Sequence, residues 1–178
     1  MIEQSAPELF ALMFGSEAVA RLTDLVQRSR NRFSHHYVRV AEIDHRVVGM
    51  VILVPAISVQ DRADYRDGFT ITQRIWLKLV HSLLPYVVRH DYPAGTFYIG
   101  NLAVAAEYRN QGIGHQLLSQ CIAEVKAASS TLFISVDVSN LRAQKLYESL
   151  GFKVVGTKTI RLFGTTIGSH ILALSILD

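Results

Sequence analysis

Gly112 and Gly114 are the residues of this chain whose type and spacing point most directly to chemistry. One residue separates them, and the apolar residues that follow recur with helical spacing. A glycine pair at the start of a helix lets backbone amides approach an anion without obstruction by Cβ atoms, and the helix N-terminus adds partial positive charge. Arg109 adds a formal positive charge at the mouth of this turn. The segment therefore predicts a site for a diphosphate rather than a carboxylate.

Two common nucleotide-binding motifs do not fit this segment. A phosphate-binding loop of the Walker type needs Gly-Lys followed by Ser or Thr, whereas His115 and Gln116 follow Gly114 here. A dinucleotide fingerprint needs three glycines and an acidic residue after a second strand. Asp137 does follow an expected strand, but only two glycines are present and the first strand lies in mid-chain after a hairpin. Both readings are excluded.

The run Arg109-Asn110-Gln111-Gly112-Ile113-Gly114 resembles the coenzyme A signature of the GNAT superfamily of N-acetyltransferases. That signature is Gln or Arg, two variable residues, Gly, one variable residue, then Gly or Ala. A second block, residues 135–152, also resembles the family and ends in Gly151-Phe152. The resemblance is strongest from about Tyr98 to Val155. It implies an acetyl-CoA-dependent N-acetyltransferase, with acetyl-CoA (coenzyme A) as acyl donor and no metal.

The resemblance also implies roles for individual residues. The backbone of Leu102, Ala103 and Val104 would pair with the pantetheine arm. Asn140 would contact that arm, and Tyr147 would protonate the departing thiolate. The pyrophosphate would be held at Arg109 and by the amides of Asn110, Gln111, Gly112, Ile113, Gly114 and His115.

The acceptor side is less defined, because Asn101 stands where many family members place a glutamate base. Asn101 is expected to orient substrate or water. Asp137, Asp67, His81 and His90 are candidate bases, each with an alternative and favoured role as a turn cap or solvated side chain. The resemblance implies a primary amine of a small molecule or peptide as acceptor. The alternative is a non-catalytic domain that senses acetyl-CoA.

The elements that must position these residues follow from hydrophobic periodicity. Residues 8–30 read as two short helices and residues 36–54 as a hairpin turning at Asp44-His45-Arg46. The remaining expected elements are a helical insertion at 56–95, a strand at 97–104, a helix at 109–128, a strand at 132–138, a helix at 141–150 ended by Gly151, and strands at 152–161 and 170–177.

These elements predict an α/β (α+β) fold of one domain over residues 1–178. The expected sheet is mixed, mostly antiparallel and splayed at the cofactor site, as in the GNAT family, with flanking helices. The insertion would lie between the third and fourth strands and is a candidate lid over the acceptor. Family members usually begin with a strand that this chain lacks, which leaves a sheet edge open and motivates a hypothesis of homodimerisation.

Composition sets the remaining expectations. Of 178 residues, 49% are hydrophobic and 19% charged, with a formal net charge of +3. The basic residues are scattered, so nucleic acid is not expected as a partner. Residues 47–59 are too short to span a membrane, and the single cysteine, Cys121, fits a buried thiol in a reducing, cytoplasmic setting. The seven histidines lack the spacing of a metal site.

Overall fold

The computed structural model describes residues 1–56, 92–128, 130–162 and 165–175. Three helices come first: α1 (Ile2–Ser5), α2 (Pro7–Phe14) and α3 (Ala18–Gln27). The rest of the described chain contains β1 (Val38–Ile43), β2 (Arg46–Pro55), β3 (Phe97–Val104), α6 (Ile113–Ala127), β4 (Thr131–Asp137), α7 (Leu141–Ser149), β5 (Lys153–Leu162) and β6 (Thr165–Ser175).

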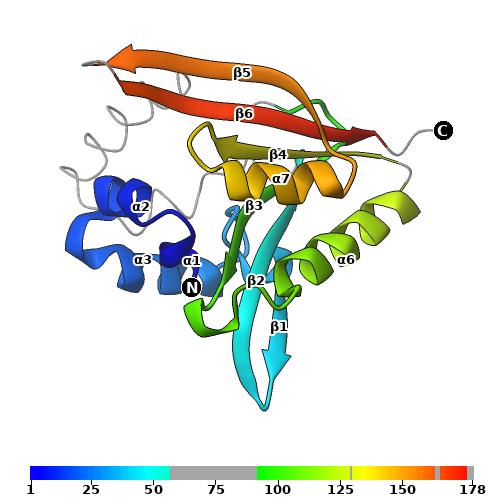
Figure 1. The fold of residues 1–178 in the computed structure, drawn as a ribbon. Helices are drawn as coiled ribbons and strands as arrows, with labels where there is room; N and C mark the ends of the chain where they lie inside the picture. Colours follow the sequence, from blue (N-terminus) through cyan, green and yellow to red (C-terminus); the bar gives the residue numbers. More distant parts are fainter. Residues whose placement is uncertain (57–91, 129, 163–164, 176–178) are drawn as a thin grey trace.

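The strands form one sheet of order β1-β2-β3-β4-β6-β5. Only the β3–β4 pair is parallel, and the other four pairs are antiparallel. Figure 1 shows that β1, β2 and β3 lie roughly upright in the view, while β4, β6 and β5 lie across it as a second group. The mixed, mostly antiparallel sheet predicted from the sequence is confirmed.

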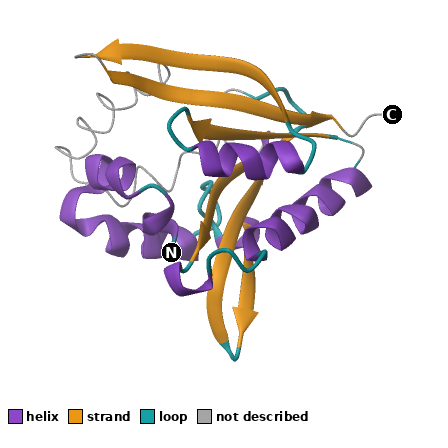
Figure 2. Ribbon diagram, viewed as in Figure 1, coloured by secondary structure: helices purple, strands orange, loops and turns teal. Residues whose placement is uncertain are grey.

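Helices lie on both faces of the sheet (Figure 2), so the inner strand β2 is buried from two sides. One core lies under α6 and α7 and includes Leu118, Cys121 and Phe152. The other lies under α1, α2 and α3 and includes Phe10, Leu25 and Tyr98. The nearly continuous apolar run of β2 supplies side chains to both cores, as expected for a strand covered on two faces.

Helix α6 approaches the sheet closely because β2 carries a glycine beneath it. A Cβ atom on Gly49 would lie 2.9 Å from Cγ2 of Ile113 and 3.1 Å from Cδ1 of Leu117. Cys121 lies in this tightly packed region as the sequence predicted, and burial raises the pKa of its thiol to about 12. The thiol is therefore inert at neutral pH.

Two turn predictions are confirmed in detail. Asp44 and His45 connect β1 to β2 with φ values of 48° and 60°, the left-handed pair that a two-residue hairpin requires. Gly151 follows α7 with φ of 91°, as expected for a glycine that ends a helix. Arg46, expected in the first turn, is instead the first residue of β2.

Several predicted boundaries were wrong. The helix expected from Arg109 begins only at Ile113, and residues 109–112 form a turn. The last strand, expected from His170, begins at Thr165. The insertion was expected between the third and fourth strands, but among the described strands it lies between β2 and β3. The numbering differs because the family's usual first strand is absent among the described strands. Most of that insertion lies outside the described residues, as does the lid expected there.

Candidate active site

The sheet opens between its two central strands. β3 and β4 pair at only three positions, Phe97 with Leu132, Tyr98 with Phe133, and Ile99 with Ile134. The ladder between β2 and β3 skips Gly100, so a β-bulge falls just after the last paired residue of β3. From the bulge onward, β3 runs without β4 beside it. This is the splay that the resemblance implied.

The backbone of β3 offers hydrogen bonds on its free side. The amide of Ala105 donates to the carbonyl of Val48 at 2.9 Å. In an antiparallel ladder every second residue hydrogen-bonds the neighbouring strand, so this bond shows which residues of β3 bond to β2. The backbone groups of Ala103 therefore face β2, while those of Leu102 and Val104 face the opening. Of the three residues expected to pair with the pantetheine arm, only Leu102 and Val104 have backbone groups directed to the opening. The Val104 carbonyl also accepts from Arg109 Nε at 3.1 Å.

The turn before α6 presents its backbone amides to solvent. Asn110 and Gly112 both adopt left-handed conformations, with φ of 65° and 79°, and no side chain caps the helix. Within the described part of the chain, none of the amides of residues 110–115 donates a hydrogen bond. Free amides at a helix N-terminus form an anion site through their hydrogen bonds and the helix dipole.

Side chains around this turn brace it instead of filling it. Arg142 Nη2 on α7 donates to Asn110 Oδ1 at 2.6 Å, and Gln111 Nε2 donates to the Glu107 carbonyl at 3.2 Å. A Cβ on Gly114 would lie 3.6 Å from Cδ2 of Leu146, so this glycine packs α6 against α7. The two remaining residues of the predicted pyrophosphate site differ in burial: the Ile113 side chain is buried in the core, and His115 is exposed.

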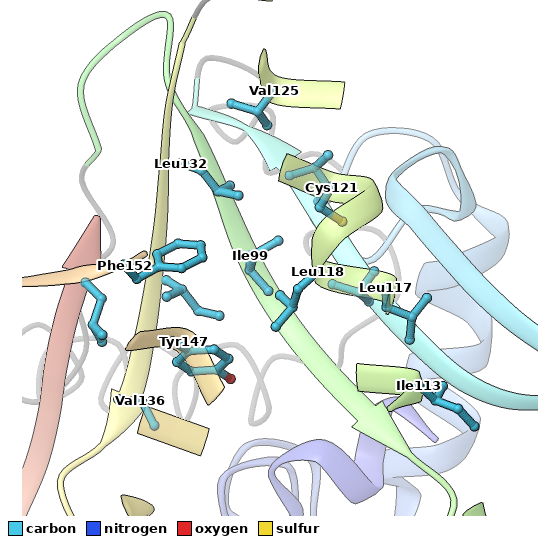
Figure 3. Close-up of a cluster of buried hydrophobic side chains, with 14 of the residues drawn as sticks. Ile99, Ile113, Leu117, Leu118, Cys121, Val125, Leu132, Val136, Tyr147 and Phe152 are labelled. Atoms are coloured by element: carbon cyan, nitrogen blue, oxygen red, sulfur yellow. The ribbon is translucent and has the colours of Figure 1, made fainter. Parts of the chain in front are cut away.

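Tyr147 lies on α7 beneath the same opening. It is 6% exposed, its ring centroid lies 6.2 Å from that of Phe152, and burial raises its pKa to about 12. Figure 3 shows its hydroxyl on the side of the ring away from Phe152. The phenol is neutral at physiological pH, and packing against Phe152 orients its ring.

Asn140 caps helix α7 through its side chain. Its Oδ1 accepts from the Ala143 amide at 3.1 Å, the usual role of asparagine at this position. The cap role was missed from the sequence, although an asparagine immediately before a helix is its ordinary signal.

Asn101 follows the bulge and faces the opposite side of the sheet from Tyr147, against α1. Ser5 Oγ donates to the Ile2 carbonyl at 2.6 Å, so it must accept from Asn101, whose Nδ2 lies 2.7 Å away. This chain of bonds fixes the orientation of the amide. Asn101 Oδ1 is consequently left buried without a hydrogen-bond donor, an unpaired acceptor on the β3 residue that follows the bulge.

Of the four candidate bases, only Asp137 lies in the described part of the chain. Asp137 closes a turn by accepting from the Ser139 amide at 2.8 Å and from Ser139 Oγ at 2.6 Å, which is the cap role favoured for it. Asp67, His81 and His90 lie outside the described residues. Among the residues that are described, no three side chains of His, Cys, Asp or Glu gather as a metal site, and no described helix is long and apolar enough to cross a membrane.

Comparison with known proteins places this arrangement in a family. A model described as the acetyltransferase (GNAT) family matches residues 4–152. The chain therefore belongs to the GNAT acetyltransferase family.

Among curated proteins, the chain is similar to the ribosomal protein bS18-alanine N-acetyltransferase of Escherichia coli K12, with 47% identity over 53 residues, 29% of this chain and 36% of that protein. It is also similar to human N-alpha-acetyltransferase 30, with 41% identity over 56 residues, 31% of this chain and 16% of that protein. The chain thus matches about a third or less of the length of these relatives.

Solved structures share the fold across nearly the whole chain. An N-acetyltransferase from Staphylococcus aureus Mu50 superimposes with a TM-score of 0.72 at 18% identity, covering 97% of this chain and 93% of that one. A GNAT acetyltransferase from Elizabethkingia anophelis with acetyl-CoA bound gives 0.56 at 18% identity, covering 98% and 88%. At this identity the likeness concerns the fold.

Proposed function

We propose that this protein is an N-acetyltransferase that moves an acetyl group from acetyl-CoA to a primary amine of a peptide or small molecule. The observation that carries the proposal is the row of free amides at residues 110–115, next to the unpaired edge of β3. The amides would hold the pyrophosphate, and Leu102 and Val104 would hydrogen-bond the pantetheine arm. Family membership and a relative solved with acetyl-CoA support the choice of ligand.

The residues on either side of the splay have complementary roles in this reaction. Acetyl-CoA supplies a thioester whose carbonyl carbon is attacked by the neutral amine; a C–N bond forms and the C–S bond breaks. Tyr147 donates its phenolic proton to the thiolate as coenzyme A leaves. Its pKa of about 12 keeps the phenol protonated at physiological pH. The proton lost by the amine leaves through water, which returns the phenol to its neutral state.

Asn101 would receive the amine. Its unpaired Oδ1 would accept a hydrogen bond from the amine and align the nitrogen lone pair, but an amide is too weak a base to remove the proton. An α-amino group suits a site without a strong base, because its ordinary pKa is about 7.7–8.0 and much of it is neutral near pH 8. The named activities of the bS18-alanine and N-alpha relatives favour a peptide N-terminus in the same way.

The experiment is to follow coenzyme A thiol release from acetyl-CoA with a panel of amines: short peptides with free N-termini, the same peptides N-terminally blocked, a lysine side-chain amine and a polyamine. Release with free N-termini alone supports the proposal. Tight binding of acetyl-CoA without release for any amine would instead favour the alternative, a sensor domain without turnover, for which the absence of a carboxylate at Asn101 is the supporting observation.

Homodimerisation is a second proposal that concerns assembly. β1 is an edge strand, and Val40 on it is 51% exposed. A second copy pairing along this edge would cover the strand. Light scattering at micromolar concentration is expected to give a dimer mass, and a monomer mass would contradict the proposal.

A further inference from the structure

Arg32 places a cation at the apex of the splay. It lies in the segment between α3 and β1, and its Nη2 reaches to 3.5 Å from the carbonyl oxygen of Gly100, the bulge residue of β3. A Cβ on Gly100 would come within 3.2 Å of the same nitrogen. The guanidinium is therefore adjacent to the first β3 residue beyond the paired segment and to Asn101, which follows it.

The guanidinium is held in place but left without a counter-ion. Its central carbon lies 5.2 Å from the ring centroid of Phe33 and 5.8 Å from that of Tyr98, which fixes its orientation through cation–π contacts. Its Nε is buried without a hydrogen-bond partner, and no carboxylate in the described residues pairs with it. The guanidinium has five N–H donors, and the only hydrogen bond it makes to the described residues is the long one, 3.5 Å, from Nη2 to the Gly100 carbonyl.

An unpaired charge in a partly buried position is costly unless something neutralises it. Another partly buried arginine, Arg39, is paired with Glu124 at 2.9 Å, and that bond raises its pKa. Arg32 has no such partner within reach of the described chain. A ligand that carries a negative group would neutralise it, and the position of Arg32 beside Gly100 makes the acceptor a suitable source of that group.

The two faces of the sheet separate the donor from the acceptor. Tyr147 belongs to the core under α6 and α7, the side on which the turn amides lie. Phe33 and Tyr98, which hold Arg32, belong to the core under α1, α2 and α3. On this second face the chain offers two unpaired groups to an acceptor: Asn101 Oδ1, which accepts a hydrogen bond, and the Arg32 guanidinium, which donates.

We propose that Arg32 determines acceptor specificity by binding a carboxylate of the acceptor while Asn101 receives its amine. This inference rests on the proposed acetyltransfer. The carboxylate can belong to a free amino acid or to an acidic side chain near a peptide N-terminus, and both present the same planar group to the guanidinium fork. The same cation repels polyamines and other polycationic amines, so it selects against them as well.

Acceptors matched except for one carboxylate test the proposal, with each rate divided by the neutral fraction of its amine. One pair is a peptide amide beginning alanine–aspartate and its counterpart beginning alanine–asparagine; the other is free alanine and alaninamide. The expected kcat/KM is about tenfold to a hundredfold higher for the carboxylate member of at least one pair, the range of a charge-assisted hydrogen bond. Which pair responds tells the acidic peptide from the free amino acid.

Variants then connect the preference to the residue. Arg32→Gln is expected to bring the ratio within each pair close to one, with unchanged affinity for acetyl-CoA by calorimetry, and Arg32→Lys to keep part of the preference. Arg28→Gln, which removes an ion pair with Asp24 at the C-terminal end of α3, is the matched control and should leave the ratio unaltered. Arg32→Lys keeps the comparison open should Arg32→Gln fold poorly.

The outcomes separate this inference from the proposed function. Thiol release without charge preference in the wild-type protein, or a preference that survives Arg32→Gln, would overturn the role of Arg32 and leave the acetyltransfer standing. Absence of acetyl-CoA binding, or of release with every amine, would overturn the acetyltransfer and the inference with it.

Discussion

Arg142 on the first turn of α7 donates a hydrogen bond of 2.6 Å to Oδ1 of Asn110 in the turn before α6. This bond joins the two helices that flank the splay. It also holds Asn110 in a left-handed conformation, with φ of 65°, that asparagine tolerates better than most residues. The turn whose amides are proposed to hold the pyrophosphate is thus braced from across the opening.

Removing either partner should loosen the turn. Arg142→Ala and Asn110→Ala are each expected to weaken acetyl-CoA binding severalfold, and the double variant to be less than additive, with a coupling of about 0.5–1.5 kcal/mol. Calorimetric titration of the four proteins measures the coupling. Strict additivity would show that the bond does not brace the binding turn, or that Arg142 contacts the ligand independently.

Gly112 offers a test with an internal control. Gly112→Val is expected to weaken acetyl-CoA binding severely, because a branched Cβ both strains the left-handed backbone and obstructs the amides. Gly95 has nearly the same backbone, with φ of 78° against 79°, and neither glycine has an atom within 4 Å of an added Cβ. Gly95→Val should therefore cost similar stability yet leave binding intact. Equal loss of binding in both variants would reduce the effect to misfolding.

Tyr147→Phe tests the acid. The ring stays packed against Phe152, so acetyl-CoA affinity and thermal stability should be nearly unchanged. Turnover is expected to fall by roughly tenfold to a thousandfold, the usual range for a lost general acid. Because the pKa of Tyr147 is about 12, the phenol stays protonated from about pH 6 to 9. Its deprotonation should therefore not limit the wild-type rate in that range. An undiminished rate in the variant would remove Tyr147 from the mechanism.

Ser5 orients Asn101 and can be changed without touching the reaction site. Ser5→Ala removes the acceptor of the 2.7 Å bond from Asn101 Nδ2, so the amide is free to flip. The expected result is a severalfold rise in KM for the amine with unchanged acetyl-CoA affinity. Ser149→Ala is the control, because Ser149 likewise donates to a carbonyl three residues before it, at 2.7 Å, but on α7. A matching rise in that control would contradict the assignment.

Local signals made much of the fold predictable from the sequence. The strand from Phe97 to Val104, the hairpin turn at Asp44-His45 and the helix end at Gly151 were all predicted because periodicity and turn chemistry are short-range properties. The start of α6 was misplaced because the turn residues before Ile113 have no strand or helix pattern of their own.

Gly168 shows why the last strand was misread. That strand was expected to begin only at His170, but the structure places Gly168 inside β6, where an added Cβ would overlap the Lys158 carbonyl of β5. Close approach of two strands, rather than a turn, explains this glycine. The sequence could not distinguish the two, because the close neighbour is ten residues away along the chain.

The residues that contact the acceptor side of the site could not be predicted from the sequence for the same reason. Ser5 meets Asn101 across 96 positions of sequence and Arg32 meets Gly100 across 68. No local pattern marks Ser5 or Arg32 among the other serines and arginines. The residues of the binding turn were identifiable because they are contiguous, whereas those that orient the acceptor side come together only when the chain folds.

The central claim is that the free amides before α6 and the open edge of β3 form a site for acetyl-CoA, and calorimetric titration of the purified protein with acetyl-CoA tests it most directly. The account predicts saturable binding of one ligand per chain that Gly112→Val abolishes and Gly95→Val preserves. Absence of binding by the wild-type protein, or equal binding by Gly112→Val, would contradict it.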